Sequence, residues 1–197
     1  RRAGARIIAV VDPDEARGGA LARQHYPAQV YPSLEDALSR VHPTAVHLCT
    51  PSAFHRQQTE QALKSGAHVF IEKPLAQTLE DTQEILLLAE QNKLLVCPVH
   101  QFIFQDGVQR LQHWLLSAGE VVQASVTIHS AGGVGSPPQE FEALVADILP
   151  HPLSVLQNLL PGSLDVPWAV RRPAPGELRV IGADNRNGVG LTIEISM

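Results

Sequence analysis

The sequence predicts an α/β protein in which a partial, Rossmann-type parallel sheet is followed by the start of an α+β domain with a mostly antiparallel sheet. Short, continuous apolar runs fill 6–12, 45–50, 68–72 and 94–99, as is typical of strands buried on both faces of a parallel sheet. Amphipathic stretches with helix-starting residues separate these runs. Beyond residue 120, polar and apolar residues alternate, which favours strands with only one buried face.

Four helices are predicted in the first half of the chain, at 12–25, 33–41, 53–66 and 78–92. Asp12 precedes Pro13 and is expected to cap the first helix. Ser33 and Thr78 each stand three residues before an acid, as in a capping box. Gly66 is expected to end the third helix.

The second half is predicted to begin with a helix at 106–119, a strand at 120–130 and a helix at 140–160. The runs 177–184 and 188–196 are expected to form a hairpin joined by 185–187. The glycines of 130–139 lack dinucleotide spacing and follow no parallel strand, so this segment is not expected to bind phosphate. We expect an incomplete dinucleotide-binding domain at 1–104 and a partial substrate and dimerisation domain at 105–197.

Composition excludes several classes of protein. Hydrophobic residues make up 44% and charged residues 18% of 197, and the formal net charge is −5. This balance lacks the basic excess of nucleic-acid-binding proteins. No apolar run is long enough to span a membrane, and no signal-peptide pattern opens the chain. Cys49 and Cys97 lie in apolar runs without C-x-x-C spacing, so we expect buried, reduced thiols in a cytoplasmic protein and no metal site.

Polar or conformationally restricted residues follow each predicted strand where it ends. Parallel sheets bind ligands outside the carboxyl ends of their strands, so these residues are expected to surround one crevice. They are Asp12, Thr50, Pro51, Glu72, Lys73, Pro74, His100 and Gln101.

Asp12 has two compatible interpretations. An acid at the end of a strand of a dinucleotide fold can bind the adenosine ribose hydroxyls, and an acid before Pro13 can cap a helix. The G-x-G-x-x-G turn expected about 20 residues earlier is not in the sequence, and Gly4 stands alone. We therefore expect either a fragment of a longer protein or a chain that naturally lacks this turn.

The run 50–93 resembles the glucose–fructose oxidoreductase, inositol dehydrogenase and rhizopine-catabolism family of nicotinamide-dependent oxidoreductases. The family pattern is T-P-x-x-x-H, a helix, G-x-H-V and then E-K-P. The matching residues are Thr50, Pro51, His55, Gly66, His68, Val69, Glu72, Lys73 and Pro74. A second family motif, D-x-x-x-H, is matched by Asp147 and His151, whose spacing places them on one helix face.

The resemblance implies an NAD(P)-dependent oxidoreductase that moves a hydride between nicotinamide and a hydroxyl or carbonyl carbon of a sugar, cyclitol or related small molecule. It implies that Lys73, His151 and Asp147 are catalytic and that the second-domain sheet forms a homo-oligomer contact. An acid at Asp12 favours NAD over NADP, because its carboxylate repels a 2′-phosphate. The cofactor-binding residues implied are Asp12, Thr50, Pro51, His55, Glu72, Lys73, Pro74 and Gln101.

The chain departs from the family at two further places. The segment 100–104 reads HQFIF where many members carry an Asn-Arg pair, and Pro150 precedes His151 where a glycine is usual. The proline is expected to change the local backbone. Together with the missing glycine-rich turn, these departures leave open a degenerate member that binds no dinucleotide and acts as a scaffold, a regulatory partner or a cofactor-independent enzyme.

Overall fold

The computed structural model describes residues 4–130, 138–162, 164–184 and 188–196. The chain separates into two compact units, Arg1–Val99 and His100–Met197. This division falls a few residues before the domain boundary expected after 104. The first unit has two parallel sheets, the second has one mixed sheet, and each unit has its own hydrophobic core, so the two are described in turn. No helix among the described residues is both long and apolar enough to cross a membrane.

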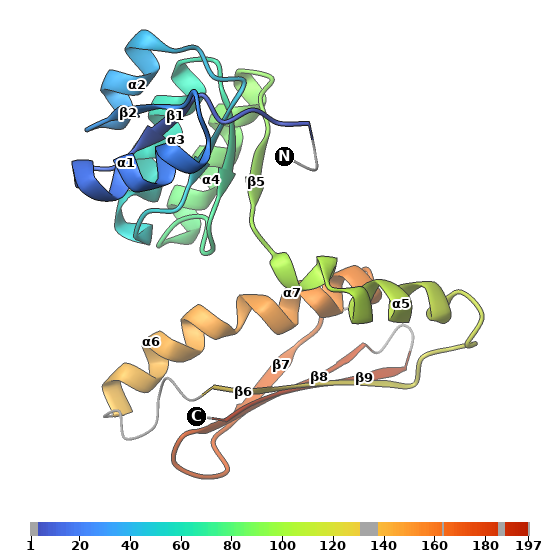
Figure 1. Cartoon of the computed structure of the whole chain (residues 1–197). Helices are drawn as coiled ribbons and strands as arrows, with labels where there is room; N and C mark the ends of the chain where they lie inside the picture. The colour runs from blue at the N-terminus through green and yellow to red at the C-terminus, as the bar shows by residue number, and fades with distance from the viewer. Residues whose placement is uncertain (1–3, 131–137, 163, 185–187, 197) are drawn as a thin grey trace. The chain divides into compact units, whose positions relative to one another are not determined.

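The first unit alternates strands and helices, as predicted (Figure 1). Strands β1 and β2 form a parallel pair, and β3, β4 and β5 form a parallel three-stranded sheet in that order. The strand β2 was not predicted, because three residues give too short a pattern to recognise. The elements are β1 (Ala9–Val11), α1 (Glu15–Gln24), β2 (Gln29–Tyr31), α2 (Leu34–Arg40), β3 (Ala45–Leu48), the 3-10 helix η1 (Ser52–Phe54), α3 (His55–Lys64), β4 (His68–Ile71), α4 (Leu79–Gln91) and β5 (Val96–Pro98).

Most helix ends in this unit follow the predicted signals. The side chains of Ser33 and Thr78 accept hydrogen bonds from backbone amides in the first turns of α2 and α4. Gly66 follows α3 with a φ of 87°, a conformation that glycine adopts at no steric cost. The predicted cap at Asp12 is wrong, because α1 begins later and Asp14 accepts the two capping hydrogen bonds.

The core of the first unit lies against one face of the three-stranded sheet. Leu48, Val69 and Ile71 point into it and meet Leu63 of α3 and Ala89 of α4. The opposite face of the sheet presents side chains that are exposed. The expectation of buried cysteines is therefore wrong: Cys49 and Cys97 are both exposed, because the strands alternate and only one face is covered by described helices.

Each of the two parallel sheets corresponds to one part of the strand order that is usual in a dinucleotide-binding fold. That order is 3-2-1-4-5-6. The pair β2–β1 corresponds to 3-2, and β3–β4–β5 corresponds to 4-5-6. No strand among the described residues occupies the central position, from which the phosphate-binding turn begins in such folds.

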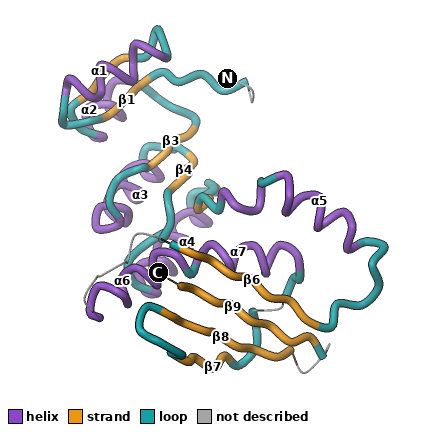
Figure 2. Tube along the Cα trace, turned by 60° about the horizontal axis from the view of Figure 1, so that its bottom comes forward, coloured by secondary structure: helices purple, strands orange, loops and turns teal. Residues whose placement is uncertain are grey.

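The second unit is an α+β layer built on one mixed sheet. Its strand order is β6-β9-β8-β7, with β6 parallel to β9 and the other pairings antiparallel (Figure 2). The predicted hairpin is present as β8 and β9, while its connection at 185–187 and most of 130–139 lie outside the described residues. The elements are η2 (Gln101–Phe104), α5 (Asp106–Leu115), β6 (Gln123–His129), α6 (Pro138–Ile148), α7 (Pro150–Leu159), β7 (Trp168–Arg171), β8 (Glu177–Asp184) and β9 (Val189–Ser196).

The helix predicted at 140–160 is two helices, α6 and α7. Pro150 stands at the start of α7 and has no amide hydrogen to bond the preceding turn. Alternate residues of β9 are buried, among them Ile193 and Ile195, and pack with Leu156 of α7. Helices α6 and α7 therefore cover one face of the sheet (Figure 1).

We expect Gly182→Val to destabilise the second unit, because a β-carbon at Gly182 would lie 2.8 Å from the ring of Trp168 on the paired strand. Such overpacking typically costs about 1–3 kcal/mol. Urea denaturation followed by tryptophan fluorescence measures the loss, since Trp114 and Trp168 both lie in this unit. Gly190→Ala is the matched control, because its β-carbon would meet its nearest neighbour at an ordinary 3.8 Å. Equal midpoints for wild type and Gly182→Val would contradict the packing argument.

Candidate active site

Two turns leave the three-stranded sheet side by side at its carboxyl edge. One follows β3 and carries Thr50 and Pro51, and the other follows β4 and carries Glu72, Lys73 and Pro74. Strands β3 and β4 pair with Leu48 opposite Ile71. The amide of Glu72 continues this pairing by donating to the carbonyl of Leu48 at 3.0 Å. Parallel register thus brings the residues of both turns to one edge.

His55 joins the two turns. Its Nδ1 lies 2.8 Å from the carbonyl oxygen of Pro74, and its Nε2 lies 2.8 Å from the carbonyl oxygen of Thr50. Each carbonyl oxygen accepts a hydrogen bond when the ring nitrogen beside it carries hydrogen. The side chain is 1% exposed. Because both nitrogens lie against backbone carbonyls, His55 holds the two turns together, and the cofactor contact expected from the sequence stays a prediction.

The other residues of the edge are more accessible. Pro51 is exposed, whereas Glu72, Lys73 and Pro74 are half-buried. The hydroxyl of Thr50 donates to the side-chain oxygen of Gln58 on α3 at 2.5 Å. The Lys73–Pro74 peptide bond is cis.

Asp12 lies at the carboxyl end of β1, where the sequence predicted a ribose-binding acid, but its oxygens already have partners. Arg17 donates to it from Nε at 2.8 Å and from Nη2 at 3.1 Å, and the amide of Asp14 donates at 2.9 Å. The hydrogen bond from Arg17 is the main cause that holds the pKa of Asp12 below its ordinary value. A ribose hydroxyl would have to share this carboxylate with Arg17.

The remaining predicted residues lie in the second unit. Gln101 opens η2 and is exposed. Asp147 lies near the end of α6, and His151 lies in the first turn of α7. The break at Leu149 and Pro150 means that the D-x-x-x-H motif spans two helices, which differs from the single helix face expected. The ring of Phe102 meets that of His151 edge-on, with centroids 4.5 Å apart.

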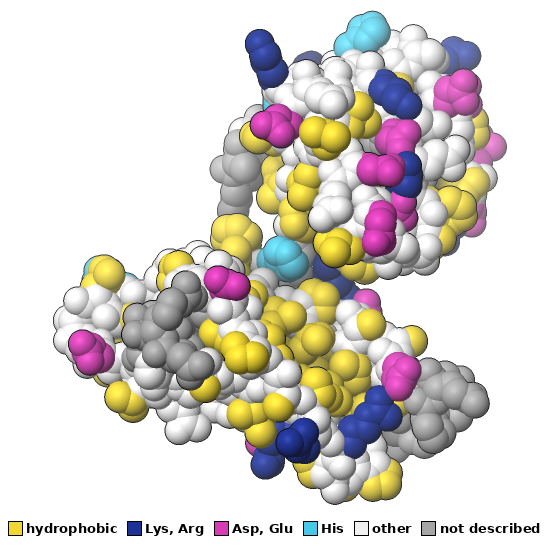
Figure 3. Space-filling view, turned by 180° about the vertical axis from the view of Figure 1, so that it is seen from behind, with side chains coloured by type: hydrophobic (Ala, Val, Ile, Leu, Met, Phe, Trp, Pro, Cys, Tyr) yellow, Lys and Arg dark blue, Asp and Glu magenta, His cyan; other side chains and the backbone are white. Residues whose placement is uncertain are grey.

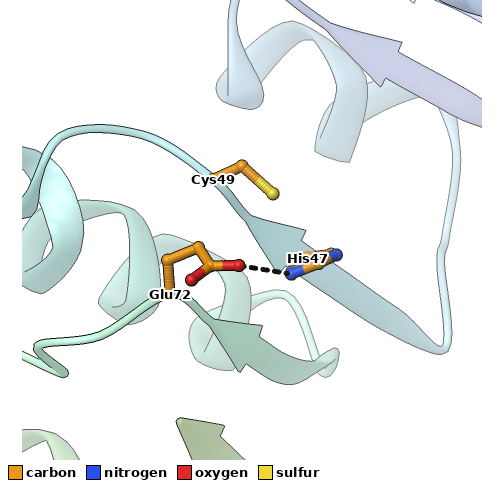
Figure 4. A group of neighbouring side chains, drawn as sticks. All are labelled: His47, Cys49 and Glu72. Atoms are coloured by element: carbon orange, nitrogen blue, oxygen red, sulfur yellow. Dashed lines mark ion pairs between the residues drawn. The ribbon is translucent and has the colours of Figure 1, made fainter. Parts of the chain in front are cut away.

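One group of side chains beside this edge was missed by the sequence reasoning. His47, Cys49 and Glu72 gather on the exposed face of the sheet (Figure 4). Nε2 of His47 lies 4.0 Å from an oxygen of Glu72. Partial burial, together with the charge of Glu72, raises the pKa of the Cys49 thiol. The sequence did hold a signal for this group. His47 and Cys49 are two residues apart at the end of one predicted strand, which puts them on one face, and Glu72 stands at the end of another predicted strand.

Charges on the first unit are mixed in sign, as the view from behind shows (Figure 3). Arg56 of α3 bonds Asp81 and Glu84 of α4, and it also reaches Glu60 one turn along its own helix at 3.2 Å. This network joins α3 to α4. The hydrogen bond from Arg56 is the largest cause that lowers the pKa of Asp81.

We expect Arg56→Met to lower the urea midpoint of the first unit at pH 7 and to lower it by less in acid. The pKa of Asp81 is lower in the folded chain than in the unfolded one, so its stabilising contribution is present above the unfolded pKa, about 4. It is lost as pH falls through the folded pKa. Far-UV circular dichroism during urea denaturation at pH 7 and pH 3 measures the difference. A wild-type advantage that grew as pH fell would contradict this account.

Known proteins resemble this chain in sequence and in fold. Residues 1–100 match the family described as oxidoreductase family, NAD-binding Rossmann fold. Inositol 2-dehydrogenase of Corynebacterium glutamicum (strain ATCC 13032) is 28% identical over 210 aligned residues, which cover 100% of this chain and 61% of that enzyme. The chain therefore spans less than two thirds of the length of this relative.

Solved structures show the same fold along nearly the whole chain. The crystal structure of a putative myo-inositol dehydrogenase from Sinorhizobium meliloti 1021 superposes with a TM-score of 0.83 at 20% identity, covering 98% of this chain and 62% of that one. The WlbA dehydrogenase from Chromobacterium violaceum, solved with NADH and UDP-GlcNAcA, gives 0.77 at 22% identity, covering 100% and 61%. Because the family match spans just over half of the chain and includes the T-P and E-K-P turns, the chain belongs to the glucose–fructose oxidoreductase, inositol dehydrogenase and rhizopine-catabolism family of oxidoreductases.

Proposed function

We propose that this chain carries the nicotinamide-facing edge of an NAD(P)-dependent oxidoreductase that acts on a hydroxyl or carbonyl carbon of a sugar, cyclitol or related small molecule. The observation that carries the proposal is the bridge made by His55, which holds the T-P turn against the E-K-P turn with 2.8 Å contacts on both sides. That bridge holds the backbone at Pro74, directly after Lys73, against the turn that carries Thr50. The family match over residues 1–100 supports the cofactor class.

The residues present fit one half of a dinucleotide better than the other. The T-P and E-K-P turns provide a polar edge for a nicotinamide, whereas no described residue supplies the glycine-rich turn that holds a pyrophosphate. When bound, nicotinamide supplies the hydride acceptor or donor. Asp12 supports NAD over NADP, because its carboxylate disfavours a 2′-phosphate.

Side chains of this chain would accept and return the proton of the substrate hydroxyl. Oxidising a secondary alcohol requires a base within hydrogen-bond reach of its hydroxyl. In our proposal Lys73 polarises the substrate oxygen and His151 exchanges the proton, while Asp147 orients the sugar or the imidazole. Thr50, Pro51, Glu72, Pro74 and Gln101 would line the nicotinamide, and Glu72 would orient Lys73.

We also propose that the chain self-associates through the face of the second-unit sheet that α6 and α7 leave uncovered. Ile181 is 40% exposed on that sheet. Sedimentation velocity of wild type and of Ile181→Glu tests this, because a charge placed in a dimer contact would shift the protein towards the monomer. A wild-type protein that sediments as a monomer across concentrations would contradict self-association.

A second candidate function is supported by the divided sheet. Because β1–β2 and β3–β4–β5 are not joined by a described central strand, a degenerate member that binds no dinucleotide and acts as a scaffold, a regulatory partner or a cofactor-independent enzyme fits the same fold. Incubating the chain with NAD⁺ and a panel of cyclitols and hexosides, while following NADH absorbance, separates the two. Substrate-dependent NADH formation supports the oxidoreductase, and its absence with every compound, together with no NADH binding, supports the alternative.

A further inference from the structure

Three side chains of types that serve as metal ligands lie together on the exposed face of the three-stranded sheet. His47 lies in β3 and Cys49 directly follows the strand, two residues further along, so extended geometry points them to the same face. Glu72 follows Ile71, which pairs with Leu48, so Glu72 comes opposite Cys49 on the neighbouring strand. One nitrogen, one sulfur and one carboxylate oxygen from these residues all lie within 4.8 Å of one another (Figure 4).

A backbone contact holds Glu72 and a ring contact holds His47 in this arrangement. The amide of Glu72 donates to the carbonyl of Leu48 at 3.0 Å, which fixes the turn of Glu72 against the end of β3. The ring of His47 meets that of Phe70 edge-on, with centroids 6.5 Å apart. In a tetrahedral zinc site with ligand bonds of about 2.0–2.3 Å, ligand atoms lie roughly 3.5 Å apart. Closing the site therefore requires the ligand atoms, now within 4.8 Å of one another, to approach by about 1 Å.

We propose that His47, Cys49 and Glu72 form a binding site for a zinc-class divalent cation at the carboxyl edge of the sheet. The ligands are Nε2 of His47, Sγ of Cys49 and one oxygen of Glu72, and water fills the fourth position. As the Sγ–metal bond forms, the thiol releases its proton to solvent and no atom changes oxidation state. A thiolate and an imidazole select zinc or cobalt over magnesium and calcium, which take oxygen ligands.

This site is separate from the proposed oxidoreductase function. It needs neither nicotinamide nor substrate, and His47 and Cys49 have no part in hydride transfer. Glu72 is the residue that both proposals share. For this reason the tests rest on His47 and Cys49 and on direct metal binding, so that failure of either proposal leaves the other intact.

Cobalt(II) reports the site directly, because a cysteine thiolate bound to cobalt gives a charge-transfer absorption band in the near ultraviolet. We expect this band in wild type and in Cys97→Ser, and we expect zinc to remove it while magnesium does not. Cys97 is the matched control, since it is also exposed and pairs with Phe70 on the next strand. Cys49→Ser should abolish the band. His47→Gln should weaken zinc binding, measured against a chromophoric chelator, by at least the roughly 10–100-fold that loss of a supporting partner costs.

A measurement on the wild-type chain tests the proposal even if the variants fail to fold. Alkylation by iodoacetamide, read by mass spectrometry of peptides, compares Cys49 with Cys97 in the presence and absence of zinc. Selective protection of Cys49 by zinc is the expected result. Equal alkylation of both cysteines with and without zinc overturns the proposal, as does a cobalt band that survives in a folded Cys49→Ser chain.

Discussion

His55→Ala is expected to destabilise the first unit by about 3 kcal/mol. The substitution empties a buried site and leaves the carbonyls of Thr50 and Pro74 without the ring nitrogens that lie 2.8 Å from them. A buried acceptor that loses its donor costs roughly 1–3 kcal/mol, and the cavity adds to that loss. Urea denaturation followed by far-UV circular dichroism measures the change.

His42→Ala is the control for this prediction, because His42 is an exposed histidine of the same unit. It should shift stability by no more than roughly 0.5 kcal/mol, as is usual for surface positions. His55→Gln should recover part of the loss, since its amide can donate to one of the two carbonyls. A His55→Ala chain as stable as the His42→Ala chain would show that the bridge does not hold the two turns.

Lys73→Met is expected to lower kcat for any substrate that the chain turns over by about 10²–10⁴-fold. Methionine keeps most of the length of the side chain but cannot polarise or protonate the substrate oxygen. Steady-state kinetics with NAD⁺ and the substrate found in the panel measure the effect. Because Lys73 stands at the carboxyl edge and outside the core, its replacement should leave the urea midpoint close to that of wild type.

Lys64→Met supplies the matched control, because Lys64 is an exposed lysine of α3 that pairs with Glu60. It removes a lysine from the same unit without touching the two turns, so kcat should not change. His151→Ala tests the proposed second proton carrier in the same assay. If kcat were retained in both Lys73→Met and His151→Ala, the assignment of these residues would be wrong.

Apart from β2, the sequence predicted the order of strands and helices in the first unit, because local signals agree with the global fold there. Ser33 and Thr78 cap the helices that they were expected to cap, and Gly66 follows its helix with positive φ. The family resemblance carried by 50–93 was confirmed by the match over residues 1–100. Helix caps, a helix-ending glycine and a family motif each depend on a few neighbouring residues, so the sequence alone reveals them.

The errors concern features that depend on distant partners. Cys49 was expected to be buried, because an apolar run does not reveal which face of a sheet is covered. The bridge made by His55 was not foreseen, since its two carbonyl partners come from separate turns. The group of His47, Cys49 and Glu72 was missed for the same reason, as only the pairing of β3 with β4 brings it together. Pro150 was recognised as a disturbance of the helix, but the division into α6 and α7 required the structure.

The central claim is that the two turns joined by His55 face a nicotinamide, and amide chemical shifts during an NADH titration test it most directly. NADH should shift the amides of Thr50, Glu72 and Lys73 in a saturable manner. The amides of α4, on the covered face of the sheet, should move far less. Saturable binding that leaves these three amides unmoved, or no binding at all, would contradict the claim.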